Sequence, residues 1–443
     1  MNHTKKTRNH GVKPMRMRVG LGLLAVAVAT AGCNTGLDLT NPNAPTEQAV
    51  LTDVEGVIAL SLGMQAQYSS AMDDYVRAPA LVTDEWGTAS KALAADQSLF
   101  AGEGIDPGYG VVSQPYYDTY RIARSADNLI AAVPALQLGK GLEVGITANA
   151  KLFKAMALGM AAQQYERLPI DAAVEGGTPV PRAEVFAEVI RLLESARADL
   201  GTVSDADLST FRDRALVPNF DVRNTVNAML ARYYLFTEQY QQALEAAQRV
   251  DLTSVSLFTY PNPDINPIYN YGVVAGYVAP LRSWAEDAEP GDQRVPFWVQ
   301  VVDESEAPKA NPPTLELLPF EMYSERNDPF PVYVPGEMLL IEAEAQAQLG
   351  DLPAARALIN QERALEGTDN TPGAELPPLS DAELATKEDI LAQIAYERRY
   401  ELYEQGLRWE DLRRLGQYVG KQPKVDFLPM PSSECQSNPN AGC

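Results

Sequence analysis

A helix–turn–helix segment at residues 333–360 constrains the fold of this chain more than any other feature. Apolar residues recur at helical spacing until Gly350 interrupts the pattern. Pro353 follows at a place where the first turn of a helix tolerates a missing N–H. The segment therefore predicts two antiparallel helices, with the small residues Ala343 and Ala355 allowing them to approach closely.

The same unit occurs a second time at residues 226–250. Ala231 and Ala243 are 12 residues apart, as are Ala343 and Ala355, and the two pairs are offset by 112 residues. A hairpin of this kind cannot bury its apolar face alone, so it stacks on a neighbour, as in tetratricopeptide repeats. We expect a right-handed stack of hairpins. The alternative is two unrelated amphipathic hairpins in an α-rich protein.

Further helical patterns cover residues 47–72, 116–133, 149–167 and 179–200, and residues 102–115 form a Gly/Pro/Tyr-rich loop. Together with the two hairpins described above, these patterns predict about four helical hairpins. The predicted fold class is mostly α, with tetratricopeptide-like helical hairpins.

The N-terminus has the pattern of an export signal. Six Lys and Arg residues precede an uncharged apolar run at residues 19–31, which is too short to span a bilayer. The run ends in ATAGC, which resembles a bacterial lipobox with Cys33 as the acylated residue, although Thr30 departs from the usual aliphatic residue. An ordinary secretory signal is the alternative. We expect a signal peptide at residues 1–32, a lipid anchor and linker at 33–46, and a single domain at 47–443.

Removal of residues 1–32 leaves 30 basic and 59 acidic residues, a formal charge of −29. Such a surface repels nucleic acid, so no nucleic-acid partner is expected. Both histidines, His3 and His10, lie in the removed segment. The mature chain therefore excludes catalysis by Ser-His-Asp or Cys-His groups and zinc sites with histidine ligands.

Cys435 and Cys443 bracket a short tail rich in turn-forming residues. Export places them in an oxidising compartment, which favours a disulfide between them. A reduced metal-binding pair is the weaker alternative, because no further ligand is nearby in the sequence.

Residues 253–332, which we call the excursion, differ from the rest of the chain in composition. Its 80 residues contain 12 of the 32 prolines together with several tyrosines and tryptophans. Prolines at this density prevent long helices, and a long irregular segment in a compact domain is usually functional. We expect function here and in the loops of residues 84–115.

The last helical segment, residues 388–416, places Glu397 and Glu401 on the face that Ile390 and Ile394 begin. Buried carboxylates need partners, and the expected ones are the nearby arginines, Arg398, Arg399, Arg408, Arg413 and Arg414. A catalytic interpretation would make the two glutamates a glycosidase pair. An ion-pair network is favoured, since adjacent turns of one helix are surrounded by arginines.

The order of these motifs resembles the SusD/RagB family of outer-membrane nutrient-binding lipoproteins. The resemblance rests on the lipobox, DLTNPN, DEW, GEMLLIEAEAQAQLGDLPAARALIN, ERRYELYEQGLRWEDLRRLG and LPMP. It implies a SusD-like helical protein, lipid-anchored at the outer membrane and exposed at the cell surface, that captures a glycan and closes over a SusC-like TonB-dependent barrel. It also implies a structural role for the motif residues Glu337, Glu344, Glu397, Glu401, Arg408, Trp409 and Asp411.

The ligand-facing residues cannot be transferred from the family by motif, so we predict them from sugar chemistry. Sugars present apolar C–H faces ringed by hydroxyls, and binding needs aromatic platforms with polar groups at their edges. The candidates are Asp84, Trp86, Tyr269, Asn270, Tyr271, Tyr277, Arg282, Trp284 and Trp298. For each aromatic residue the alternative is packing in the core or under a loop.

Three functions remain open. The leading one is glycan capture without catalysis. The second is binding of a peptide or another nutrient, for which the acidic body would suit cationic ligands. The third is a carbohydrate-active enzyme with a carboxylate pair. No cofactor is expected, and a structural calcium ion has no support in the sequence.

Overall fold

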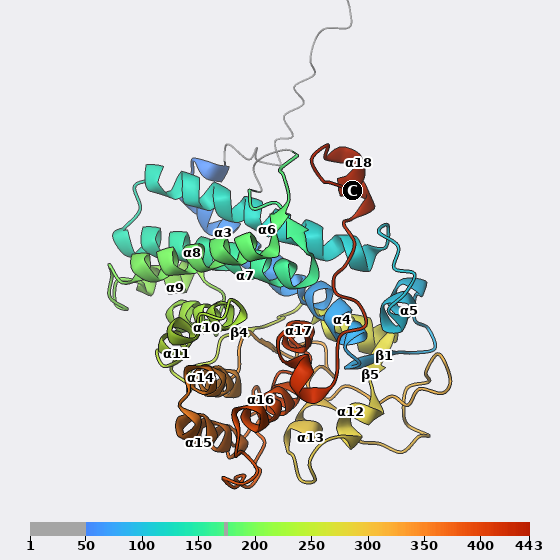
Figure 1. Ribbon diagram of the computed structural model, residues 1–443. Coiled ribbons are helices and arrows are strands. Elements are labelled where there is room, and N and C mark those ends of the chain that lie inside the picture. Colours follow the sequence, from blue (N-terminus) through green and yellow to red (C-terminus); the bar gives the residue numbers. More distant parts are fainter. Residues whose placement is uncertain (1–49, 172–175) are drawn as a thin grey trace, which may run out of the picture. The chain divides into compact units, whose positions relative to one another are not determined.

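Paired antiparallel helices make up most of the chain in the computed structural model (Figure 1). The structure describes residues 50–171 and 176–443, which belong to one compact unit. The expected signal peptide, Cys33 and the linker lie outside the described residues. No helix among the described residues is long and apolar enough to cross a membrane.

The helices are α3 (Val54–Ser70), α4 (Met72–Val82), α5 (Ala94–Ala101), α6 (Gly110–Ala132), α7 (Lys140–Gln164), α8 (Arg182–Leu200), α9 (Ser209–Ala215), α10 (Val222–Phe236), α11 (Tyr240–Ala247), α12 (Arg282–Glu286), α13 (Arg294–Trp298), α14 (Pro335–Leu349), α15 (Leu352–Arg363), α16 (Lys387–Glu401), α17 (Arg408–Val419) and α18 (Ser432–Ser437). A 3-10 turn, η1 (Val133–Ala135), and a π-helix, η2 (Tyr269–Val274), complete the set.

The two repeated hairpins are present and stack on each other. Helix α10 packs on α11, α14 packs on α15, and α11 packs on α14 (Figure 1). All four spaced alanines are fully buried, as close helix packing requires. Gly350 ends α14 in the left-handed conformation, and the Asp351 side chain caps α15 by accepting from the Ala354 N–H. The mostly helical fold class and the hairpin at residues 333–360 are confirmed.

Two helices begin earlier than expected. Helix α6 starts at Gly110, inside the predicted loop, although Pro115 in its interior removes one backbone N–H from the helix. Helix α7 starts at Lys140 rather than near residue 149. Its first turns contain Gly145, where a Cβ would lie 2.2 Å from the Phe211 ring. Glycine in this helix therefore serves close contact with α9.

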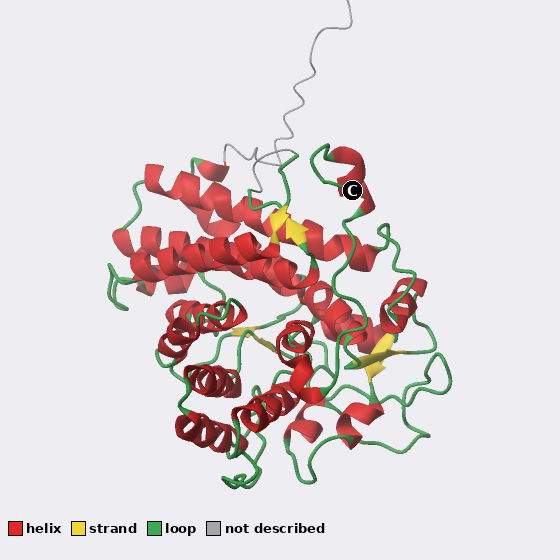
Figure 2. Ribbon diagram, viewed as in Figure 1, coloured by secondary structure: helices red, strands yellow, loops and turns green. Residues whose placement is uncertain are grey.

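The strands are short and occur as three antiparallel pairs (Figure 2). They are β1 (Trp86–Thr88) with β5 (Val278–Pro280), β2 (Arg167–Leu168) with β3 (Val180–Pro181), and β4 (Leu257–Phe258) with β6 (Phe330–Pro331). Strands β4 and β6 lie at the two ends of the excursion, so their pairing closes it into a loop. Strand β1 ties the middle of the excursion to the segment after α4.

Tryptophans attach the excursion to the last helix pair. The Trp284 ring stacks on Tyr403 with 3.8 Å between ring centroids, and its Nε1 donates to the Arg399 carbonyl at 3.3 Å. Trp298 Nε1 donates to the Tyr400 carbonyl at 2.9 Å. Ring stacking together with hydrogen bonds from the indole N–H groups fixes the position of this irregular segment.

An ion-pair network lies beneath the excursion, as expected for Glu397, but with different partners. Glu397 accepts from Arg294 Nη2 at 2.6 Å and Arg363 Nη1 at 2.7 Å, and all three side chains have no exposed surface. The arginines predicted from the neighbouring sequence bind other groups. For example, Arg398 pairs with Asp411 at 2.9 Å. The prediction failed on the partners because they come from α13 and α15, far away in the sequence.

The other motif residues also hold elements together. Arg232 of α10 binds Glu337 of α14 at 2.6 Å, and Arg414 of α17 binds Glu344 of α14 at 2.5 Å. Trp409 Nε1 donates to the Val425 carbonyl at 2.8 Å, and Arg408 Nη1 to the Ala395 carbonyl at 3.1 Å. Each bond joins separate segments, which is a structural role.

Glu401 differs from Glu397 in having no arginine bound to its carboxylate among the described residues. It is buried against Gly336, where a Cβ would lie 2.1 Å from the Glu401 Oε1. Burial raises the pKa of Glu401 to about 8.

The C-terminal tail carries the predicted disulfide between Cys435 and Cys443. Cys435 lies within α18 (Ser432–Ser437), and the disulfide joins it to the last residue of the sequence, Cys443.

Candidate functional site

Two neighbouring cavities lie where the excursion meets the segment after β1. The first, which we call the lysine cavity, has a volume of about 440 Å³ and is lined by residues 89–91, 272, 273, 276, 278, 279, 300, 308, 309, 319, 320 and 324. The second, the Arg282 cavity, has a volume of about 580 Å³. Ser90, Pro308 and Lys309 line both. Residues 89–91 and part of the excursion therefore line two adjoining cavities.

Backbone pairing fixes the walls of this site. Ala89 and Ala310 form an antiparallel bridge, the Ser90 N–H donates to the Lys309 carbonyl at 2.6 Å, and the Asn311 N–H donates to the Thr88 carbonyl at 2.9 Å. On the other side, the Ala89 N–H donates to the Tyr277 carbonyl at 3.0 Å. Residues 88–91 are thus held between two parts of the excursion.

Five polar side chains line the lysine cavity: Ser90, Lys91, Gln300, Lys309 and Ser324. None of them makes a side-chain hydrogen bond or an ion pair with another residue of the described ranges 50–171 and 176–443. Their donors and acceptors are free for a ligand. No Asp or Glu is among the described residues that line this cavity.

Two glycines shape the same cavity. A Cβ at Gly272 would lie 2.4 Å from Phe320, so the ring of Phe320 packs directly on the η2 backbone. Gly276 has φ +68° and lies beside Lys91, whose Nζ is 3.6 Å from the place of a Cβ. Glycine is favoured at a positive φ, and here it also leaves room for the lysine side chain.

The apolar part of the site includes Val273, Pro308, Pro319 and Phe320. Val273 is 43% exposed and its neighbour Val274 is 55% exposed. Both belong to η2, and π-helical turns occur often at functional sites. An apolar wall with free hydrogen-bonding groups beside it is the arrangement that small polar ligands such as sugars require.

Arg282, one of the predicted site residues, lines the second cavity. Its Nη2 donates to the Val302 carbonyl at 2.8 Å, and its Nε lies 3.4 Å from a Glu316 carboxylate oxygen. Glu304 and Glu316 also line this cavity, so both signs of charge are present.

The three tryptophans predicted to face the ligand are packing residues instead. Trp86, Trp284 and Trp298 have no exposed surface. Trp86 meets Phe320 edge to face with 5.3 Å between centroids, and its Nε1 donates to Glu404 Oε1 at 3.2 Å. Trp86 therefore supports the cavity wall from behind, because Phe320 lines the lysine cavity. The three tryptophans present no platform to a sugar.

Asp84 is also placed away from the cavities. It forms ion pairs with Lys421 at 3.1 Å and with Lys424. Its φ of +61° turns the chain from α4 into β1. These ion pairs join the segment after α4 to the C-terminal segment, and Asp84 lines neither the lysine cavity nor the Arg282 cavity.

The predicted tyrosines lie together near η2. Tyr271 and Tyr277 pack edge to face with 5.0 Å between centroids. The Tyr271 hydroxyl donates to Asp96 Oδ2 at 2.7 Å, and the Arg77 guanidinium lies 4.0 Å from its ring centroid. Burial raises the pKa of Asp96, which Arg77 partly offsets. Tyr271 is therefore held by the protein, whereas Tyr269 and Asn270 retain exposed surface at the start of η2.

Sequence reasoning missed Ser90, Lys91, Gln300 and Lys309. The signal that could have found the lysines is rarity: Lys309 is the single lysine between residues 155 and 386. A lone lysine in a long acidic stretch of sequence is worth attention.

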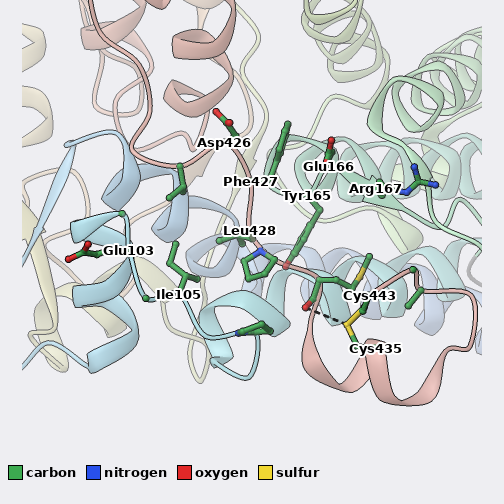
Figure 3. Close-up of a pocket in the computed structure, with 18 residues that line it drawn as sticks. Glu103, Ile105, Tyr165, Glu166, Arg167, Asp426, Phe427, Leu428, Cys435 and Cys443 are labelled. Carbon is green, nitrogen blue, oxygen red and sulfur yellow. Dashed lines mark hydrogen bonds between the residues drawn. A yellow bond between two sulfur atoms is a disulfide. The ribbon is translucent and has the colours of Figure 1, made fainter.

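A third cavity, the tail cavity, lies beside the disulfide (Figure 3). It has a volume of about 740 Å³, with Cys435 and Cys443 at one end and Glu103 and Ile105 at the other. Arg167 lines it but donates to the Pro179 carbonyl at 2.8 Å. Three carboxylates, of Glu103, Glu166 and Asp426, also line it, so its charge is opposite in sign to that of the lysine cavity.

The glutamates of the catalytic alternative are not accessible. Glu397 and Glu401 have no exposed surface, and neither lines any of these three cavities. Within residues 50–171 and 176–443, no group of three or more His, Cys, Asp or Glu side chains is placed to hold a metal ion.

Comparison with known proteins agrees with the resemblance seen in the sequence motifs. Residues 320–426 match the model of the SusD family. No curated protein sequence matches the chain.

Similar solved structures cover nearly the whole described unit. A SusD-like carbohydrate-binding protein from Bacteroides vulgatus has a TM-score of 0.67 at 15% identity, over 87% of this chain and 97% of its own. A laminarin-binding SusD-like protein has a TM-score of 0.64 at 18% identity, over 85% and 97%. NanU of B. fragilis has a TM-score of 0.65 at 17% identity, over 90% and 98%. At these identities the likeness shows the fold.

Proposed function

We propose that this chain belongs to the SusD family, whose model matches residues 320–426, and that it binds a glycan at the lysine and Arg282 cavities and does not cleave it. The observation that carries the proposal is the lysine cavity itself. It combines an apolar wall with five polar side chains that have no partner among the described residues. Hydroxyl-rich ligands bind through such free donors and acceptors.

Two features support binding rather than catalysis. The glutamates at adjacent turns of α16 are buried away from the cavities, and Glu397 is neutralised by Arg294 and Arg363. Similar proteins named for carbohydrate or laminarin binding have the same fold.

We further propose that the glycan passes to a SusC-like TonB-dependent barrel, and that Cys33 anchors the protein at the outer membrane, exposed at the cell surface. The lipobox-like sequence before Cys33 and the family motifs support this part. A pull-down of the membrane form under mild detergent is expected to recover a barrel protein. Recovery of the chain alone would contradict the partnership.

The binding proposal is tested by a glycan array followed by calorimetry with purified protein. We expect saturable binding of at least one glycan and no shortening of that glycan on prolonged incubation. Gln300→Ala is expected to weaken binding about fivefold to tenfold, because it removes one hydrogen-bonding side chain of the cavity. Binding of a peptide library without binding of any glycan would overturn the proposal, as would cleavage of the bound glycan.

A further inference from the structure

The distribution of lysines in this protein is uneven. Residues 50–443 contain eight lysines. Five of them, Lys140, Lys151, Lys154, Lys421 and Lys424, bind a carboxylate or a carbonyl oxygen. Among the other three, Lys91 and Lys309 line the same cavity although they are more than 200 residues apart in the sequence.

The lysine cavity itself contains no compensating charge, although Glu304 and Glu316 line the neighbouring Arg282 cavity. The chain has 59 acidic residues, yet none lines the lysine cavity. Neither ammonium group has an ion-pair partner in residues 50–171 and 176–443. Two free cations beside an apolar wall favour a ligand that carries negative charge.

The lysines are held at the cavity by their backbones. The Ser90 N–H donates to the Lys309 carbonyl, and the Ala89–Ala310 bridge precedes this bond. Lys91 lies over Gly276, as described above. The two side chains therefore start from neighbouring points on a fixed wall, which limits the entropy lost when both bind one ligand.

From these observations we propose that the lysine cavity selects an acidic saccharide, one whose bound sugar carries a carboxylate or a sulfate group. This inference rests on the proposed glycan-binding function and specifies its ligand class. Both groups present oxygen atoms that accept charge-assisted hydrogen bonds from ammonium groups.

The overall negative charge of the protein acts against such a ligand, but at longer range. At physiological ionic strength the interaction between exposed charges is largely screened beyond about 8 Å. Contacts with the two lysines lie within this distance, and the carboxylates nearest to them among the cavity-lining residues are those of Glu304 and Glu316 in the Arg282 cavity. The net charge therefore slows the approach of an anionic glycan more than it weakens the bound state.

The test is calorimetry with ligand pairs that differ only in charge. One pair is an oligouronate and its methyl ester, and the other is a sulfated oligosaccharide and its desulfated form. We expect the charged member of at least one pair to bind at least tenfold more tightly than the neutral member, with an affinity that falls as salt rises. The pair that shows the difference identifies the acidic group as carboxylate or sulfate.

Amino-acid substitutions test whether this difference in affinity arises in the lysine cavity. Lys91→Ala and Lys309→Ala should each weaken binding of the charged member about tenfold and leave the neutral member nearly unchanged. Lys91→Arg should retain most of the affinity, because it keeps the charge. Lys387→Ala, in the first turn of α16, is the matched control and should have no effect. Both cavity lysines are exposed, so the variants should fold.

Equal binding of the charged and neutral members would overturn the inference, and so would unchanged affinity in both cavity variants. If neutral glycans bind and charge makes no difference, the proposed glycan-binding function stands and the acidic ligand class fails. If no glycan of either kind binds, the proposed function itself fails. Preference for an acidic peptide over every saccharide would also overturn the inference.

Discussion

Arg294 shows how much a single buried residue contributes to this structure. Its guanidinium contacts Asp292 at 2.8 Å, Glu362 at 2.7 Å and Glu397 at 2.6 Å, and none of the four side chains has exposed surface. Removing the cation leaves buried carboxylates without compensation, which typically costs about 3–5 kcal/mol.

We therefore expect Arg294→Met to lower the free energy of unfolding by about 3–5 kcal/mol, measured by urea denaturation. The control is Arg249→Met, because Arg249 is part of an exposed pair with Glu245. It should leave the midpoint almost unchanged. Equal effects of the two substitutions would contradict the structural role of the network.

Glu85 provides a test of pH dependence. Burial raises its pKa to about 8, although Arg408 and Arg399 act in the opposite direction. In the unfolded chain this carboxyl releases its proton near pH 4.5, whereas the folded protein retains it up to about pH 8. Its contribution to stability is thus fully present below pH 4.5 and is lost as pH rises toward 8.

Glu85→Gln removes this titration. Between pH 5 and 8, the stability of the variant relative to the parent should rise by about 1.4 kcal/mol per pH unit. Urea denaturation at pH 5, 6.5 and 8 measures the difference. The exposed Glu366→Gln should show no such trend. A constant difference between Glu85→Gln and the parent across these pH values would show that Glu85 is ionised in the folded state.

Single residues were the hardest part of the site to predict. Aromatic residues were selected as sugar platforms, but the tryptophans have no exposed surface because they attach the excursion to α16 and support Phe320. A sequence does not distinguish a tryptophan that faces a ligand from one that faces the core, since both need a large apolar group. The signal for Lys309 was the rarity of lysine in this part of the sequence, and a search for aromatic residues did not use it.

At the scale of elements, η2 is the segment most closely tied to the site. Gly272 in this π-helix contacts Phe320, and both line the lysine cavity. A methyl group at Gly272 would force the ring to move, and overpacking of this kind costs about 1–3 kcal/mol.

We expect Gly272→Ala to weaken glycan binding by at least tenfold and to lower the melting temperature. Calorimetry and thermal unfolding measure the two effects. Gly63→Ala in α3 is the control, because a Cβ there meets nothing within 4 Å. This substitution in a helix should stabilise the protein slightly and leave affinity unchanged. Unaltered binding by Gly272→Ala would show that the ligand does not use this cavity wall.

Elements were predicted better than single contacts. The hairpins followed from helical spacing and from small residues at repeated positions, because these depend on local sequence. The start of α7 was misplaced, since Gly145 is selected by its contact with Phe211 rather than by helix propensity. The partners of Glu397 were also missed, because Arg294 and Arg363 approach it only after the excursion and α15 have folded.

At the scale of the whole molecule, net charge does not predict the charge of each cavity. The formal charge of −29 after removal of residues 1–32 suggested cationic ligands for the peptide alternative. The lysine cavity has the opposite sign, whereas the tail cavity is lined by carboxylates. Solubility depends on the total charge, but recognition depends on the charges within a few ångströms of the ligand.

The measurement that tests the central claim most directly is a crystal structure of the protein with a glycan identified on the array. We predict sugar density in the lysine cavity, within hydrogen-bond distance of Lys91, Lys309 or Gln300, extending toward Arg282. An intact glycan bound instead in the tail cavity, or on the outer surface of the helical hairpins with the lysine cavity empty, would contradict this account.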